Sequence, residues 1–133
     1  RATVTTQRPG QIPVIGVVTA GLPILAVENQ EGSISWDGDP NCFALRVRGD
    51  SMINARIFDG DIVYIRQQNT IENGEIAAVL IGQEATLKRV YRDGRNLILQ
   101  AENPVYKPII LSLDEGDDVR ILGLAVAFVS RLH

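Results

Sequence analysis

The sequence predicts a mainly β fold, made of strongly twisted sheets or a small open barrel. Short runs rich in β-branched and apolar residues recur along the chain, and glycine-containing turn pairs separate them. No heptads, internal repeats or low-complexity tracts are present. The length of 133 residues suits one domain with a core of useful size.

The predicted strands follow from these runs. The first is the β-branched segment from Ile12 to Val18, and the second is the alternating segment from Phe43 to Val47. The remaining predicted strands are Ile62 to Arg66, Glu75 to Ile81, Ala85 to Tyr91, Leu97 to Gln100 and Val119 to Val129. A single helical turn is expected from Ile53 to Phe58.

Turn pairs tolerate a positive φ at little cost, and tight hairpins require such an angle. The pairs are Asp37-Gly38, Asp59-Gly60, Asn73-Gly74 and Asp93-Gly94. Residues 92–95 and 82–84 are therefore predicted to form hairpin turns between adjacent strands.

Domain organisation is predicted from a change in composition near the start. Residues 1–11 are polar, lack periodicity and contain a Pro-Gly pair, which is typical of a linker. We expect 1–11 to be the remnant of an interdomain linker, 12–133 to be one domain, and the whole to be the C-terminal piece of a longer protein.

Composition narrows the class of protein. The sequence is 45% hydrophobic and 22% charged, which is typical of a soluble globular protein. Its net charge of -3 argues against this segment binding a nucleic-acid backbone by itself. No apolar run reaches the ~18 residues of a membrane span, and no signal-peptide pattern occurs. The single cysteine, Cys42, allows no internal disulfide. We expect a cytoplasmic protein without a membrane contact.

Few side chains are available for catalysis or metal binding. The only histidine is His133, at the end of the sequence, so neither a Ser-His-Asp triad nor a multi-histidine metal site is expected. The acidic run 114–118 is interpreted as a solvated loop, with a calcium site as the alternative. No cofactor is predicted.

Ser51, in the stretch Gly49-Asp50-Ser51-Met52, is either a turn residue or a nucleophile, depending on whether a base is near. The sequence contains only two lysines, Lys88 and Lys107. A lysine acts as a base only when burial or nearby positive charge removes its proton near neutral pH. Lys107 precedes a proline in a polar connection and is expected to stay charged.

Lys88 lies inside a predicted strand and shares one face with Thr86 and Val90. If that face is covered, the pKa of Lys88 is depressed. Strand lysines are more commonly exposed, so periodicity alone leaves both alternatives open.

Four motifs in order resemble the C-terminal domain of LexA-type repressors. They are the segments from Ile12 to Ala26, Arg48 to Met52, Phe58 to Ile65 and Thr86 to Val90, and the likeness continues through Ala101-Glu-Asn-Pro, Lys107-Pro-Ile-Ile and Leu122 to Ala127. The resemblance covers residues 12–129. It implies a self-cleaving protease and dimerisation domain of the fold shared with signal peptidases.

The resemblance also implies roles for individual residues. Ser51 and Lys88 would form a serine–lysine dyad that cuts the bond between Ala20 and Gly21. The family's activator is the RecA filament on single-stranded DNA, and its operator DNA is bound by an N-terminal domain absent from this sequence. The implied function is a homodimeric repressor of the SOS response to DNA damage.

Other functions stay open at this stage. Phage repressors and UmuD-like polymerase subunits share the dyad, although the Ala-Gly bond favours a repressor. A signal-peptidase-like enzyme would act on other chains and needs a membrane anchor. A non-catalytic β-rich dimerisation module would use Ser51 only structurally, with Ile121 to Val129 as an interface or a core strand.

Overall fold

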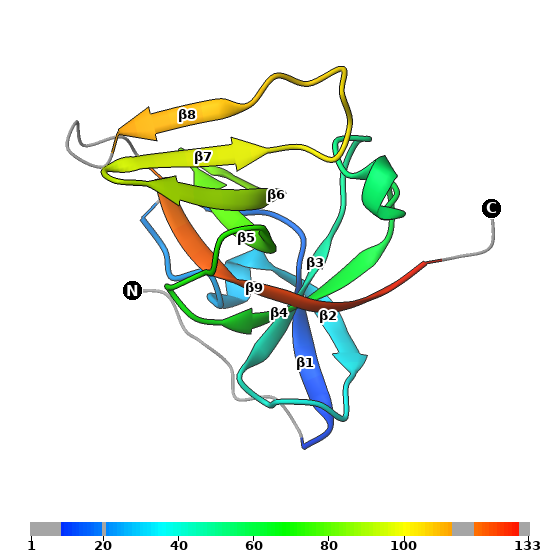
Figure 1. Ribbon diagram of the computed structural model, residues 1–133. Coiled ribbons are helices and arrows are strands. Elements are labelled where there is room, and N and C mark those ends of the chain that lie inside the picture. Colours follow the sequence, from blue (N-terminus) through cyan, green and yellow to red (C-terminus); the bar gives the residue numbers. More distant parts are fainter. Residues whose placement is uncertain (1–8, 20, 113–118, 131–133) are drawn as a thin grey trace.

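The computed structural model describes residues 9–19, 21–112 and 119–130. Nine strands form one open sheet in the order β2-β1-β3-β4-β9-β5-β6-β7-β8 (Figure 1). The strands are β1 Gln11–Ile15, β2 Gln30–Ser35, β3 Cys42–Arg46, β4 Ile62–Gln67, β5 Glu75–Ile81, β6 Glu84–Asp93, β7 Asn96–Gln100, β8 Ile109–Ser112 and β9 Val119–Val129. Two short 3-10 helices, η1 Val27–Asn29 and η2 Ile53–Ala55, complete the described elements. The predicted mainly β class is confirmed.

Strand β9 joins two halves of the sheet. Its first part pairs with β5 and its later part pairs with β4, both in antiparallel fashion. Figure 1 shows β9 running from the half that holds β5–β8 into the half that holds β1–β4. A Cβ on Gly123 would lie 2.2 Å from the Arg66 carbonyl oxygen, so β9 needs glycine where it crosses β4.

The predicted strands are present, with small differences at their ends. Glu75–Ile81 and Val119–Val129 agree with the prediction, whereas the first strand stops at Ile15 instead of Val18. The predicted helical turn is the shorter η2. Strands β2 and β8 were not predicted. They lie at the two edges of the sheet and bury few side chains, so they lack a clear alternation of apolar and polar residues.

Two predicted hairpin turns are confirmed. Asp93 pairs with Asn96 across the β6–β7 turn, and Ile81 pairs with Glu84 across the β5–β6 turn. Gly94 at the first turn has a φ of +59°, a left-handed angle that glycine adopts without strain.

The main core lies where the two halves of the sheet meet. Phe43 and Ile65 from β3 and β4 belong to the same buried cluster as Leu87 from β6 and Leu122 from β9. Met52, which is 1% exposed, packs into this cluster from the loop after β3. Full burial of a side chain of this size stabilises the fold by about 1.5–3 kcal/mol. The core therefore anchors the loop that carries Ser51.

Candidate active site

Ser51 lies in a tight turn that follows β3. Gly49 has a φ of +83°, and its N–H donates a hydrogen bond of 2.7 Å to Oδ1 of Asp59. On the other side of Ser51, the buried Met52 fixes the chain in the core. The serine is thus held between a glycine turn and a core anchor, while it is itself only partly buried.

Ser51 lines a cavity of about 290 Å³ between the β3 loop and β6. Val47 and Arg48 contribute from the side of β3, and Glu84, Thr86 and Leu87 contribute from β6. The cavity therefore brings the serine beside the strand that carries Lys88.

Lys88 is buried, with 9% of its surface exposed. Strand β6 lies between β5 and β7 in the sheet, and Lys88 is paired with Ala77 of β5. Burial lowers the pKa of the Lys88 amine, because the charged form loses its water, while the Glu84 carboxylate acts to raise it. The periodicity left open whether Lys88 lies on an exposed or a covered face of its strand, and in the structure Lys88 is covered.

Tyr106 connects the surroundings of Ser51 and Lys88. Lys88 Nζ lies 5.9 Å from the centre of the Tyr106 ring, and the Tyr106 hydroxyl donates a hydrogen bond to Oδ1 of Asp50. The Asn103 side chain also donates to the Asp50 carbonyl, at 2.9 Å. Sequence reasoning missed Tyr106 and Asn103 as site residues. The only signal for them was their position in the motif Ala101-Glu-Asn-Pro and the residues after it.

The predicted cleavage segment lies near the turn between β5 and β6. Ala20 lies outside the described residues, whereas Gly21 is described and has a φ of +78°. The Leu22 N–H donates to the Thr19 carbonyl at 3.2 Å, so described residues on either side of Ala20 are hydrogen-bonded to each other.

Gly21 lines a cavity of about 630 Å³ together with Leu80, Gly82, Gln83 and Arg120. The described lining of this cavity includes neither Ser51 nor Lys88. A third cavity, of about 300 Å³, is lined by Val17 and Val18 and shares Arg48 and Glu84 with the Ser51 cavity. The Ser51 cavity and this third cavity are therefore neighbours, and the third cavity reaches residues just before the predicted scissile bond.

The Asn29 side chain holds this segment on both sides of the predicted scissile bond. Its Oδ1 accepts a hydrogen bond of 2.8 Å from the Thr19 N–H, and its Nδ2 donates to the carbonyls of Pro23 and Ile24, each at 3.1 Å. Asn29 itself is 1% exposed, and each of the three bonds is part-buried. We call this set of contacts the Asn29 clasp. Sequence analysis did not predict it.

Other parts of the described chain offer fewer candidates for a site. Within residues 9–19, 21–112 and 119–130, no group of three or more His, Cys, Asp or Glu side chains could hold a metal ion. The acidic run 114–118, predicted as a solvated loop with a calcium site as the alternative, lies outside the described residues, and so does His133. The described part also contains no helix long and apolar enough to cross a membrane.

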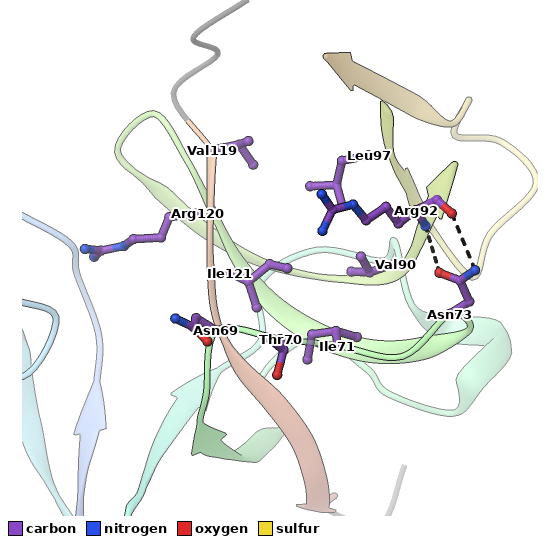
Figure 2. Close-up of a pocket in the computed structure, with 10 residues that line it drawn as sticks. All are labelled: Asn69, Thr70, Ile71, Asn73, Val90, Arg92, Leu97, Val119, Arg120 and Ile121. Atoms are coloured by element: carbon purple, nitrogen blue, oxygen red, sulfur yellow. Dashed lines mark hydrogen bonds between the residues drawn. The ribbon is translucent and has the colours of Figure 1, made fainter. Parts of the chain in front are cut away.

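Figure 2 shows the residues that line a further cavity, of about 330 Å³, and none of them lines the Ser51 cavity. Its lining comes from β6, β7, β9 and the loop before β5, and includes Asn73 and Arg92, whose hydrogen bonds the figure draws. No described lining residue is shared with the cavities of Ser51 or Gly21 except Arg120.

Comparison with known proteins is consistent with this geometry. The Peptidase S24-like family matches residues 13–126. The chain is 46% identical to a LexA repressor of Caldicellulosiruptor saccharolyticus, covering 92% of this chain and 60% of the relative. It is 47% identical to a LexA repressor of Magnetococcus marinus, covering 87% and 51%, and 42% identical to that of Bacillus cytotoxicus, covering 100% and 65%.

The chain thus spans between about half and two thirds of the length of these relatives. The resemblance to the C-terminal domain of LexA-type repressors is confirmed by the family match and by these identities. The match extends from β1 to β9 and includes both Ser51 and Lys88. This chain belongs to the Peptidase S24-like family.

Proposed function

We propose that this chain is the self-cleaving domain of a LexA-type repressor of the SOS response, and that it cuts its own Ala20-Gly21 bond. The observation that carries the proposal is the buried lysine on the strand next to the Ser51 cavity. Burial favours the neutral amine, and only a neutral lysine can accept a proton from a serine hydroxyl.

In the proposed reaction, Ser51 Oγ attacks the carbonyl carbon of Ala20 while the Lys88 amine takes the hydroxyl proton. The tetrahedral intermediate collapses when the resulting ammonium gives its proton to the Gly21 nitrogen, which leaves as the new amino terminus. Water then hydrolyses the acyl-enzyme ester. The Ser51 backbone N–H is proposed to stabilise the developing oxyanion.

The proposed regulation depends on where the cleavage segment lies. A tethered bond has a high effective concentration, so the uncut protein persists only if the segment is usually held away from Ser51. The placement of Gly21 beside the β5–β6 turn supports this idea. The rate then scales with the fraction of molecules in which the segment has moved to the serine.

We propose the RecA filament on single-stranded DNA as the activator, acting by preferring the form that can cut. Operator DNA would be bound by a separate N-terminal domain of the longer protein, and cleavage would separate that domain from this one. These partners are carried over from the family, as is a cytoplasmic location. No cofactor enters the proposed reaction.

A homodimer is proposed as the working form. Val126, Phe128 and Val129, near the end of β9, are between 38% and 53% exposed. In the described sheet, β5 pairs with β9 only as far as Leu124, so the next residues of β9 have β4 on one side alone. An apolar strand with an open edge is suited to pairing with a second copy.

The deciding experiment is incubation of the pure protein at alkaline pH, followed by mass spectrometry of the products. We expect two fragments that correspond to a cut between Ala20 and Gly21, at a rate independent of protein concentration. Ser51→Ala and Lys88→Ala should stay folded and uncut. An intact wild-type chain under all conditions, or a rapid cut in Lys88→Ala, would refute the proposed mechanism.

A further inference from the structure

We propose that Tyr106 is a positioning residue that covers the Lys88 amine and ties it to the Ser51 turn. This inference rests on the proposed function, because it gives Lys88 the role of base. The Tyr106 ring lies over Lys88 Nζ, at 5.9 Å, and its hydroxyl bonds to Asp50, the residue directly before Ser51.

The loop that carries Tyr106 is held in place by its own hydrogen bonds. The Tyr106 N–H donates to the Asn103 carbonyl at 3.0 Å, and the Val105 N–H donates to Asn103 Oδ1 at 3.1 Å. Asn103 is buried and donates in turn to the Asp50 carbonyl. The ring is therefore fixed at its backbone end by Asn103 and at its hydroxyl end by Asp50.

The ring acts on the Lys88 amine in two opposite ways. Its negative face attracts the ammonium ion, but that attraction extends only to about 6 Å, so at 5.9 Å it is weak. Its bulk excludes water, which disfavours the ammonium ion. Because Lys88 is 9% exposed, we infer that the exclusion of water is the larger effect.

The other ionisable groups around Lys88 do not reverse this balance. Glu84, on the same strand, favours the charged amine, and it stays in place when the ring is altered. Arg89 and Glu102 form an ion pair with each other. Strand β5 places the apolar Ala77 beside Lys88. The Asp50 carboxylate accepts the hydrogen bond of the Tyr106 hydroxyl.

Lysine NMR tests the inference directly, because Lys88 and Lys107 are the only two lysines. In a Ser51→Ala background, ¹³C-labelled lysine gives one Lys88 signal and an internal reference from Lys107. We expect Tyr106→Ala to move the Lys88 titration to higher pH. We expect the Lys88 titration in Tyr106→Phe to stay close to that of the parent protein, since this variant retains the ring.

Self-cleavage provides a second readout. At neutral pH, Tyr106→Ala should cut about three- to tenfold more slowly than the wild type, because fewer molecules hold a neutral Lys88. The difference should vanish at high pH, where the amine is neutral in both proteins. Val105→Ala, at a neighbouring residue that is 83% exposed, is the matched control and should change neither readout.

The two readouts separate the inference from the proposed function. A Lys88 titration that stays in place, or moves to lower pH, in Tyr106→Ala overturns the role of Tyr106 even if the wild type cuts itself. A wild-type chain that never cuts overturns the proposed function, and the lysine titration still decides whether Tyr106 shields the amine.

Discussion

The Arg48 guanidinium donates a hydrogen bond of 3.1 Å to the Gly16 carbonyl, and so ties the Ser51 turn to the predicted cleavage segment. The Gly16 N–H donates to the Asn29 carbonyl at 3.0 Å. Arg48 also lines both the Ser51 cavity and the neighbouring cavity that contains Val17. The serine and the segment are therefore connected through a short series of hydrogen bonds, and each of these can be tested.

Replacement of Asn29 tests the clasp. Asn29→Ala removes all three hydrogen bonds, so the Thr19 amide should exchange with solvent at least about tenfold faster, and the domain should lose about 1–3 kcal/mol of unfolding free energy. Hydrogen-exchange NMR in a Ser51→Ala background measures the first effect, and urea titration measures the second. Asn29→Asp keeps the acceptor for Thr19 and should keep its amide protected. If the Thr19 amide exchanged equally fast in Asn29→Ala and Asn29→Asp, the hydrogen bond from Thr19 to Asn29 Oδ1 would be contradicted.

Lys88 should make stability depend on pH. Its pKa is lowered in the folded protein, so between the folded and unfolded values the unfolded chain binds more protons, and stability rises with pH. Lys88→Met removes this titration. It should be more stable than the parent at neutral pH, with a gap that narrows as the pH approaches the ~10.4 of a free lysine.

Chemical denaturation across this pH range, again in a Ser51→Ala background, measures the gap. Lys107→Met is the matched control, because it removes the only other lysine of the sequence. A gap that widens with rising pH would show that Lys88 is stabilised as the ammonium ion in the folded state.

Glu84 should slow self-cleavage near neutral pH. Its carboxylate raises the pKa of Lys88, so Glu84→Gln should increase the fraction of neutral amine. Interactions of exposed charges contribute ~0.2–1 kcal/mol, which corresponds to a rate increase of about 1.4- to fivefold. The initial rate of cleavage, followed by mass spectrometry, measures the change. Glu72→Gln, in the loop before β5, is the control and should cut at the wild-type rate. If Glu84→Gln cut more slowly than the wild type, the proposed effect of Glu84 on Lys88 would be contradicted.

The end of β9 should control dimerisation. Phe128→Asp places a charge in the exposed apolar part of β9 and should raise the dimer dissociation constant by about a hundredfold or more, because a buried unpaired charge is costly. Sedimentation equilibrium measures the constant. Val105→Asp alters a more exposed apolar residue outside β9 and should leave it unchanged. If Val105→Asp weakened the dimer and Phe128→Asp did not, the interface would lie outside the end of β9.

The buried parts of the fold were easier to predict than its edges. The segments Glu75–Ile81 and Val119–Val129 are apolar runs that pack in the middle of the sheet, and their bounds agree with prediction. In contrast, β2 has the polar sequence QEGSIS, and what makes it a strand is its pairing with β1. Such tertiary pairing leaves little trace in the local sequence.

The candidate site was predictable only in part. Ser51 was singled out by its motif and Lys88 by the scarcity of other bases, but the burial of Lys88 depends on the position of β6 inside the sheet. Asn29 contacts Thr19, 10 residues away along the chain. Tyr106 contacts Asp50, 56 residues away. Neither side chain belongs to a spacing pattern that indicates such contacts.

Strand β9 has a consequence for biosynthesis. Ser51 follows β3 in one half of the sheet, Lys88 lies in the other half, and β9 provides the backbone pairing that joins these halves in the described chain. A ribosome makes residues 119–129 last among the nine strands. A growing polypeptide therefore cannot complete the sheet around the serine and the lysine until β9 has been synthesised, so the two side chains are framed by a finished fold only after that strand has left the ribosome.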